Sequence, residues 1–181
     1  MDFPGTEFNQ LLGLNFRGQA VGYFADSPGF TVDHAYIYDE NGSVFLQIVN
    51  AAWTSSQATG INDQGVVCGF YVDVSSVTHG FMLNGGTLTT LDFPGSNFTQ
   101  ALGLNNNGQV VGVYSTANGA PPMHGFVYNS ANGHFRTVDD PDGVNGGLST
   151  TTVNGINNLG QIVGFYVDKT GNTDGFIGTP K

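Results

Sequence analysis

Residues 103–114 read GLNNNGQVVGVY, and this motif decides the fold because it occurs four times along the chain. The other copies are GLNFRGQAVGYF at 13–24, GINDQGVVCGFY at 60–71 and GINNLGQIVGFY at 155–166. All four align without a gap, and successive copies begin roughly 45 residues apart, a period typical of repeat architectures. The chain is therefore an internal repeat.

Two further motifs recur at fixed places around each copy. The segment behind it is HAYIY (34–38), HGFML (79–83), HGFVY (124–128) or DGFIG (174–178). The segment in front is DFPG (2–5), NAAW (50–53), DFPG (92–95) or DDPDG (139–143). These matches predict a single repeat domain over 1–181, with units at approximately 1–49, 50–91, 92–138 and 139–181.

Each unit is expected to fold as antiparallel strands joined by hairpins. The first strand ends in Asn-x-x-Gly, where Asn favours the first position of a type I turn and Gly the left-handed position that closes the hairpin. The second strand carries a recurring glycine (Gly22, Gly69, Gly112 and Gly164), which indicates close approach of a neighbouring backbone or ring. Four antiparallel strands per unit predict an all-β fold, a four-bladed β-propeller closed by the chain itself. Another all-β repeat arrangement, such as a solenoid, is the alternative.

The fourth unit is expected to lack its outer strand. A fourth strand is predicted at 44–49, 88–91 and 135–138, whereas the last unit ends soon after Phe176. Three explanations stay open: a three-stranded last blade, an outer edge filled by another chain, or a longer array of which this is a part. Because an unpaired strand edge invites pairing, a homodimer through the incomplete fourth blade is one expectation.

Composition and charge exclude some partners. Four Lys and Arg against fourteen Asp and Glu give a net charge of −10, whereas nucleic-acid binding needs a basic face. No apolar run approaches the roughly 18 residues of a membrane-spanning helix, so no membrane span is expected. An acidic surface suits neutral sugars, and the expected partner is a small molecule or a glycan. The first residues, Met1 to Gly5, do not begin a signal peptide, which fits a cytoplasmic chain or the mature part of an exported one.

The three motifs together resemble the repeat of the bacterial extracellular HAF family, G-[IL]-N-x-x-G-Q-x-V-G-x-Y followed by H-G-F and T-x-D-x-P-G. The third unit matches most fully, at Gly103–Tyr114, His124–Phe126 and Asp92–Gly95. The second unit departs at Asn50–Trp53 and the fourth at Asp174. The resemblance implies a secreted or cell-surface β-repeat protein and assigns no activity.

The recurring histidines are the first candidates for chemistry: His34, His79 and His124, with Asp174 in the fourth place. Three histidines and a carboxylate are a suitable ligand set for a metal ion. Equivalent positions on opposite blades are, however, expected roughly 20 Å apart, too far to share one ion. Each histidine is therefore expected to make one structural hydrogen bond, with Asp2, Asp92 or Asp139 as partner. A binding role for one or two of them is the alternative.

Asp139, Asp140 and Asp142 are weak candidates for a Ca²⁺ site, because they gather three carboxylates within a short insertion. Their spacing does not match a calcium-binding EF-hand loop. A solvated acidic loop is the favoured interpretation, and no other cofactor is expected.

The loops that break the repeat are expected to carry the specific function. Trp53, the single Trp, replaces the Asp-Phe-Pro-Gly turn on the face where the loops emerge. Aromatic surfaces beside short polar side chains suit sugars and other small ligands. The predicted ligand-binding residues are Trp53, Tyr71, His79, His124 and Tyr166. A packing role for Trp53 between blades is the competing interpretation.

Three functions follow from these patterns. The favoured one is an extracellular, non-catalytic binding module with its ligand, a carbohydrate among the candidates, on the loop face. The second is a hydrolase or lyase that uses His79, His124, Asp73 and Asp168 on the same face. No Gly-x-Ser-x-Gly nucleophile motif occurs, so the prediction leans away from an enzyme. The third is a structural unit that assembles edge to edge.

Overall fold

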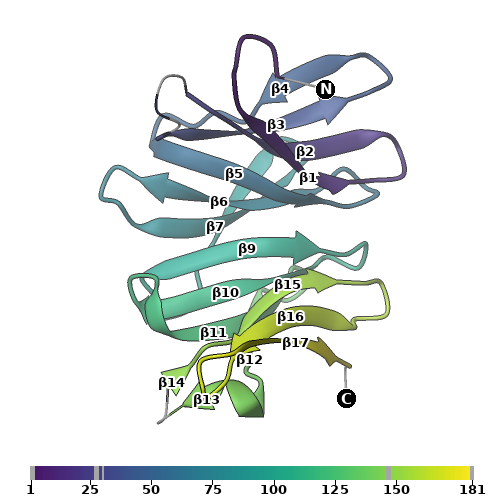
Figure 1. The fold of residues 1–181 in the computed structure, drawn as a ribbon. Helices are drawn as coiled ribbons and strands as arrows, with labels where there is room; N and C mark the ends of the chain where they lie inside the picture. The colour runs from purple at the N-terminus through teal and green to yellow at the C-terminus, as the bar shows by residue number, and fades with distance from the viewer. Residues whose placement is uncertain (1–2, 27–28, 30, 146–147, 180–181) are drawn as a thin grey trace.

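The described chain is a succession of antiparallel strand meanders (Figure 1). The computed structural model describes residues 3–26, 29, 31–145 and 148–179. Within these ranges the only helix is one 3₁₀ turn, η1 (Pro141–Gly143), so no described helix has the length and apolar character to cross a membrane. The predicted all-β fold is confirmed.

The four repeats form four consecutive strand units. Unit 1 contains β1 (Asn9–Leu14), β2 (Gln19–Ala25), β3 (Asp33–Asp39) and β4 (Val44–Gln47). Unit 2 contains β5 (Trp53–Ile61), β6 (Val67–Asp73), β7 (Thr78–Asn84) and β8 (Thr87–Leu91). Unit 3 contains β9 (Phe98–Leu104), β10 (Gln109–Ala117), β11 (Ala120–Asn129) and β12 (His134–Val138). Unit 4 contains β15 (Thr152–Ile156), β16 (Ile162–Val167) and β17 (Thr173–Gly178), and the short hairpin of β13 (Val144–Asn145) and β14 (Leu148–Ser149) precedes it.

The units form separate sheets except in the middle of the array. Units 2 and 3 share one eight-stranded sheet, because Thr78 of β7 pairs in parallel with Phe98 of β9. Figure 1 shows unit 1 at the end that carries the N-terminus and unit 4 at the end that carries the C-terminus. The array therefore has two distinct ends.

The Asn-x-x-Gly turns close the first hairpin of every unit as predicted. Asn62 Oδ1 accepts hydrogen bonds from the backbone N–H groups of Gln64 and Val66, both at 3.0 Å, and Gly65 has a φ of +83°. The equivalent asparagines make the same pair of bonds: Asn15, Asn105 and Asn157.

The recurring glycine of the second strand lies opposite a β-bulge in the first. In unit 2 the β5–β6 register shifts between Ala58 and Gly60, and Gly69 pairs with Ala58. A Cβ on Gly69 would overlap the carbonyl oxygen of Gln57 and lie 2.8 Å from Cε1 and Cζ of Phe81. The predicted close approach of a backbone and an aromatic ring is confirmed.

Much of the apolar core lies at the junctions between successive units. At each junction, one second-strand residue shares a buried cluster with the first strand of the next unit: Val21 with Ala58, Cys68 with Ala101, and Val111 with Val153. First-strand backbones also come close, because a Cβ on Gly13 would lie 3.0 Å from Gly60 Cα, and one on Gly103 would lie 3.3 Å from Gly155 Cα.

A ladder of asparagine side chains connects the four units. Asn15 Nδ2 donates to the carbonyl oxygen of Asn62 at 3.0 Å, and Asn62 Nδ2 donates to that of Asn105 at 3.1 Å. Asn105 Nδ2 donates to the carbonyl oxygen of Asn157 at 2.9 Å. Each junction thus combines an apolar cluster with a directional hydrogen bond of this ladder.

The four first strands also face a common space. Leu12, Thr59, Leu102 and Asn154, one equivalent residue from each unit, line a cavity of about 320 Å³. The same position of every repeat is therefore turned to the same side of the array.

Candidate functional site

Three units contain a stack of two aromatic rings and a histidine. In unit 2, Trp53 stacks on Tyr71 with ring centroids 4.5 Å apart, and Tyr71 stacks on His79 at 5.0 Å. The corresponding stacks are Phe3–Phe24–His34 and Phe93–Tyr114–His124. Three predicted ligand-binding residues of unit 2 are thus brought together. Trp53 takes the place that phenylalanine has in units 1 and 3, which supports a packing role for one face of its indole.

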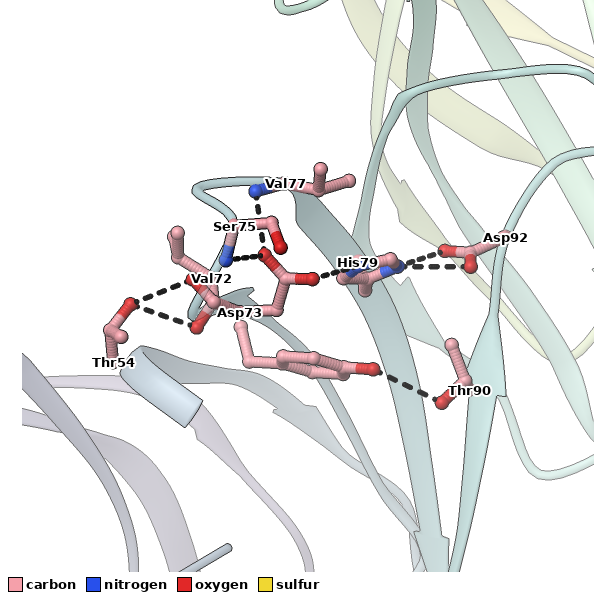
Figure 2. A network of polar contacts seen from close by, with 9 residues as sticks. Thr54, Val72, Asp73, Ser75, Val77, His79, Thr90 and Asp92 are labelled. Carbon is pink, nitrogen blue, oxygen red and sulfur yellow. Dashed lines mark hydrogen bonds and ion pairs between the residues drawn. The ribbon is translucent and has the colours of Figure 1, made fainter. Parts of the chain in front are cut away.

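His79 lies between two carboxylates (Figure 2). Its Nδ1 is 2.9 Å from Asp92 Oδ2 and its Nε2 is 3.5 Å from Asp73 Oδ2. Asp73 also accepts hydrogen bonds from the backbone N–H groups of Val77 and Ser75 at 2.9 and 2.8 Å, and the Val77 bond is the main cause that lowers the pKa of Asp73. Both ring nitrogens of His79 are therefore engaged, which suits a structural residue better than a proton-transfer group.

His124 is also paired with a carboxylate, but with one rather than two. Its Nδ1 is 2.8 Å from Asp139 Oδ2, while the other oxygen of Asp139 accepts a hydrogen bond from Ser149 Oγ at 2.8 Å. The hydrogen bonds predicted for His79 with Asp92 and for His124 with Asp139 are present. Asp2, the third predicted partner, lies outside the described residues.

His34 departs from this pattern. Its Nε2 is 3.0 Å from Asp26 Oδ1, but the residue of unit 1 equivalent to Asp92 is Asn50, whose Oδ1 accepts the backbone N–H of Ala52 at 3.0 Å. Within the described ranges, His34 Nδ1 has no hydrogen-bond partner. The carboxylate that occupies this nitrogen in units 2 and 3 is missing from unit 1.

A pocket lies beside His34 and Asn50, where unit 1 differs from units 2 and 3. It has a volume of about 210 Å³ and lies between the end of unit 1 and the first strand of unit 2. Its walls combine histidine, tryptophan and short polar side chains: Asp33, His34, Asn50, Trp53, Ser55 and Ser56, with 47–49 and Thr54 beside them. We call it the His34–Trp53 pocket.

Hydrogen bonds between the two units hold the polar wall of this pocket in place. Ser55 Oγ accepts the backbone N–H of Asp33 at 3.2 Å, and Ser56 Oγ accepts that of Ala35 at 3.0 Å. Asp33 Oδ2 accepts a hydrogen bond from Gln57 Nε2 at 2.6 Å. The pocket therefore lies at a junction that these hydrogen bonds hold together, and small-molecule sites are usually largely pre-formed.

The other predicted residues do not join this pocket. Asp168 lies in the β16–β17 hairpin, where hydrogen bonds from the Thr170 hydroxyl and then from the Asn172 backbone lower its pKa to about 2. Tyr166 lies beside four carboxylates of unit 4, and burial followed by the charge of Asp142 raises its pKa. The proposed catalytic set of His79, His124, Asp73 and Asp168 is thus divided among three units.

Two of the three candidate calcium ligands use their carboxylates in other contacts. Asp139 pairs with His124, and Asp140 Oδ1 accepts the backbone N–H of Asp142 at 3.0 Å. In the part of the chain that the structure describes, no three His, Cys, Asp or Glu side chains are grouped so that they could hold a metal ion.

Sequence reasoning identified Trp53 and the replacement of Asp by Asn50, but not the pocket beside them. It missed Ser55 and Ser56, which reach the pocket only because units 1 and 2 pack together. The available signal was that Asn50 removes the carboxylate partner of one histidine, His34.

Comparisons with known proteins agree with this fold. A family model described as "Protein of unknown function (DUF3466)" matches residues 6–141. No curated protein matches the chain. The structure of a putative TolB from Agrobacterium tumefaciens is similar, with 10% identity and a TM-score of 0.58, over 96% of this chain and 59% of that one. The chain thus spans about three fifths of the length of this structure, and the likeness shows a propeller-like fold alone.

Two further solved structures are more distant. A triple arginine-to-alanine mutant of AofleA from Arthrobotrys oligospora has 12% identity and a TM-score of 0.46, over 94% of this chain and 57% of that one. Dipeptidyl peptidase 4 from Porphyromonas gingivalis has 10% identity and a TM-score of 0.44, over 87% of this chain and 25% of that one.

Proposed function

Because this chain belongs to DUF3466, a family of proteins of unknown function, we propose its function from the geometry of its pocket. It is an extracellular or cell-surface binding module whose four units are propeller blades around one axis. Its ligand is a small, neutral, hydroxyl-rich molecule of the carbohydrate class, bound in the His34–Trp53 pocket. The blade arrangement is supported by the cavity that all four first strands line, and by the TolB likeness. The extracellular location is supported by the HAF resemblance.

The observation that carries this proposal is His34 Nδ1, which has no hydrogen-bond partner among the described residues. A polar atom beside a pocket favours a ligand that restores its hydrogen bond, because an unpaired polar group loses free energy when water is displaced. In units 2 and 3 an aspartate already occupies the equivalent nitrogen. Among the described histidines at this position of units 1 to 3, only His34 thus leaves this nitrogen open to a ligand.

The ligand class follows from the lining. Asp33, Asn50 and the two serines offer several acceptors and donors, and Trp53 adds an aromatic surface. Sugars present alternating hydroxyl and C–H faces that suit this combination. A volume of about 210 Å³ lies below the roughly 300–1,000 Å³ of sites for drug-sized ligands, so one or two sugar rings are the expected size.

The test uses Trp53 as its own reporter, since it is the single Trp of the chain. A panel of neutral mono- and disaccharides is titrated against the protein while Trp53 fluorescence is recorded, with calorimetry as a second measurement. The expected result is saturable binding that weakens at least about tenfold in His34→Ala, which corresponds to the loss of one good hydrogen bond.

A matched pair of variants locates the site. Asn50→Asp gives unit 1 the carboxylate that occupies the histidine in the other units, so it should weaken binding without deleting the pocket. Asp92→Asn makes the reverse change in unit 2 and should leave binding unchanged. Absence of binding to every sugar would refute the ligand class, and binding that ignores both His34→Ala and Asn50→Asp would refute the site.

A further inference from the structure

The two ends of the array expose positions that are buried inside it. On unit 4, Val163 is 47% exposed, whereas its equivalents Val21, Cys68 and Val111 are 0% exposed. Ile177, which pairs with Val163 across β16 and β17, is 77% exposed. Together with Phe165 on the same side of β16, these residues form what we call the trailing face.

Unit 1 presents the complementary set. Leu11 is 43% exposed, although its equivalents Ala58, Ala101 and Val153 are 0% exposed at the three internal junctions. Leu14 is also largely exposed, whereas its equivalent Ile61 is buried against unit 1. Leu11 and Leu14 form what we call the leading face.

The polar half of the junction is also incomplete at the unit 4 end. Asn157 occupies the fourth place in the asparagine ladder, but among the described residues its Nδ2 donates only to Gln161 of its own turn. A Cβ on Gly155 would meet Val163 alone, with no further first strand beside it. The expected closure of unit 4 on unit 1 of the same chain is therefore not observed.

We propose that a second copy of this chain occupies these faces, with the trailing face of one copy packed on the leading face of the next. The contact continues the three internal junctions: Val163 and Ile177 pack against Leu11 and Leu14 of the neighbour, and Asn157 Nδ2 donates to the carbonyl oxygen of its Asn15. This inference goes beyond the His34–Trp53 pocket and does not depend on it.

The contact is head-to-tail rather than two-fold symmetric. A symmetric contact of two trailing faces would bring two Asn157 donors together without the acceptor that each internal junction provides. Head-to-tail contacts form a ring if the rotation closes and a filament if it does not. Two copies would supply eight units, at the upper end of the roughly four to eight blades of known propellers.

Light scattering coupled to size exclusion, over a wide concentration range at about 0.15 M salt, measures the assembly. The wild-type chain should exceed its monomer mass of 19.0 kDa. Val163→Asp and Leu11→Asp each disable one face, so each variant alone should remain a monomer. Val74→Asp, at an exposed valine of the unit 2 hairpin, is the matched control and should assemble like the wild type.

Mixing the two monomeric variants is the decisive step. The Leu11→Asp chain keeps its trailing face and the Val163→Asp chain keeps its leading face, so the mixture should form a 1:1 heterodimer that grows no further. Ile177→Asp and Leu14→Asp provide a second pair, and circular dichroism checks that all four fold. A wild-type monomer at every concentration, assembly of either single variant, or a mixture that stays monomeric would each overturn the proposal.

Discussion

Replacing Gly69 with alanine should destabilise the protein strongly, because the new methyl group has no space. It would overlap the carbonyl oxygen of Gln57, which the β5–β6 ladder holds in place, and lie 2.8 Å from two carbons of the Phe81 ring. Carbon atoms pack favourably at about 3.5–4.0 Å, so both the bulge and the ring must move. Overpacking costs about 1–3 kcal/mol, and two simultaneous obstacles place Gly69→Ala at about 3 kcal/mol.

Urea unfolding followed by Trp53 fluorescence measures this change, because Trp53 lies 5.2 Å from the Phe81 ring, centroid to centroid. With a slope of about 2 kcal/mol per molar urea, the midpoint should fall by about 1.5 M. Gly175→Ala is the control: its Cβ would meet nothing closer than 3.7 Å, so it should be neutral or slightly stabilising. If Gly69→Ala unfolds at the same urea concentration as Gly175→Ala, the steric reasoning is wrong.

Three other predictions concern the asparagine ladder, the acidic hairpin and the cysteine. In chemical denaturation of the monomer, Asn62→Ala should destabilise by about 1 kcal/mol more than Asn157→Ala. Both variants lose the turn bonds, but only Asn62 also bonds the next unit of the same chain, so equal effects would contradict this. Asp168 has a folded pKa of about 2, below its unfolded value. Its ionised carboxylate therefore stabilises the folded protein above about pH 4, and this stabilisation fades as pH falls toward 2. The difference in melting temperature between wild type and Asp168→Asn should therefore narrow over that window, and a constant difference would refute the assignment. Burial raises the pKa of Cys68 to about 12, so an aromatic disulfide reagent at pH 8 should label it only after urea unfolding, and rapid labelling of the folded protein would count against this.

The parts of the fold that sequence predicts well are those determined within a few residues. The Asn62 turn, the close approach at Gly69 and the pairing of His79 with Asp92 each follow from a local motif repeated along the chain. Such motifs identify hairpins and their partners because hydrogen bonds and steric contacts between neighbouring strands are short-range.

The rotation between units is not predictable in this way. It depends on how residues such as Leu11 and Val163 fill the space at a junction. Closure of the ring by one chain was expected from the repeat count, but it is not observed among the described residues. The pocket could not be predicted for the same reason, because Ser55 and Ser56 lie beside His34 only where unit 2 packs against unit 1. Asp73 near His79 was likewise missed as a partner, since its hairpin has no counterpart of equal length in unit 3.

The contact between first-strand glycines, such as Gly13 with Gly60, has a consequence for how such arrays evolve. Because backbone meets backbone there, the spacing between repeats does not depend on which side chains a given copy carries. A duplicated or deleted repeat would find the same docking surface on either side, whatever its loops had become. Repeat number can then change between relatives while the closest distance between neighbouring first strands stays constant, and loops such as the one before Trp53 can diverge freely.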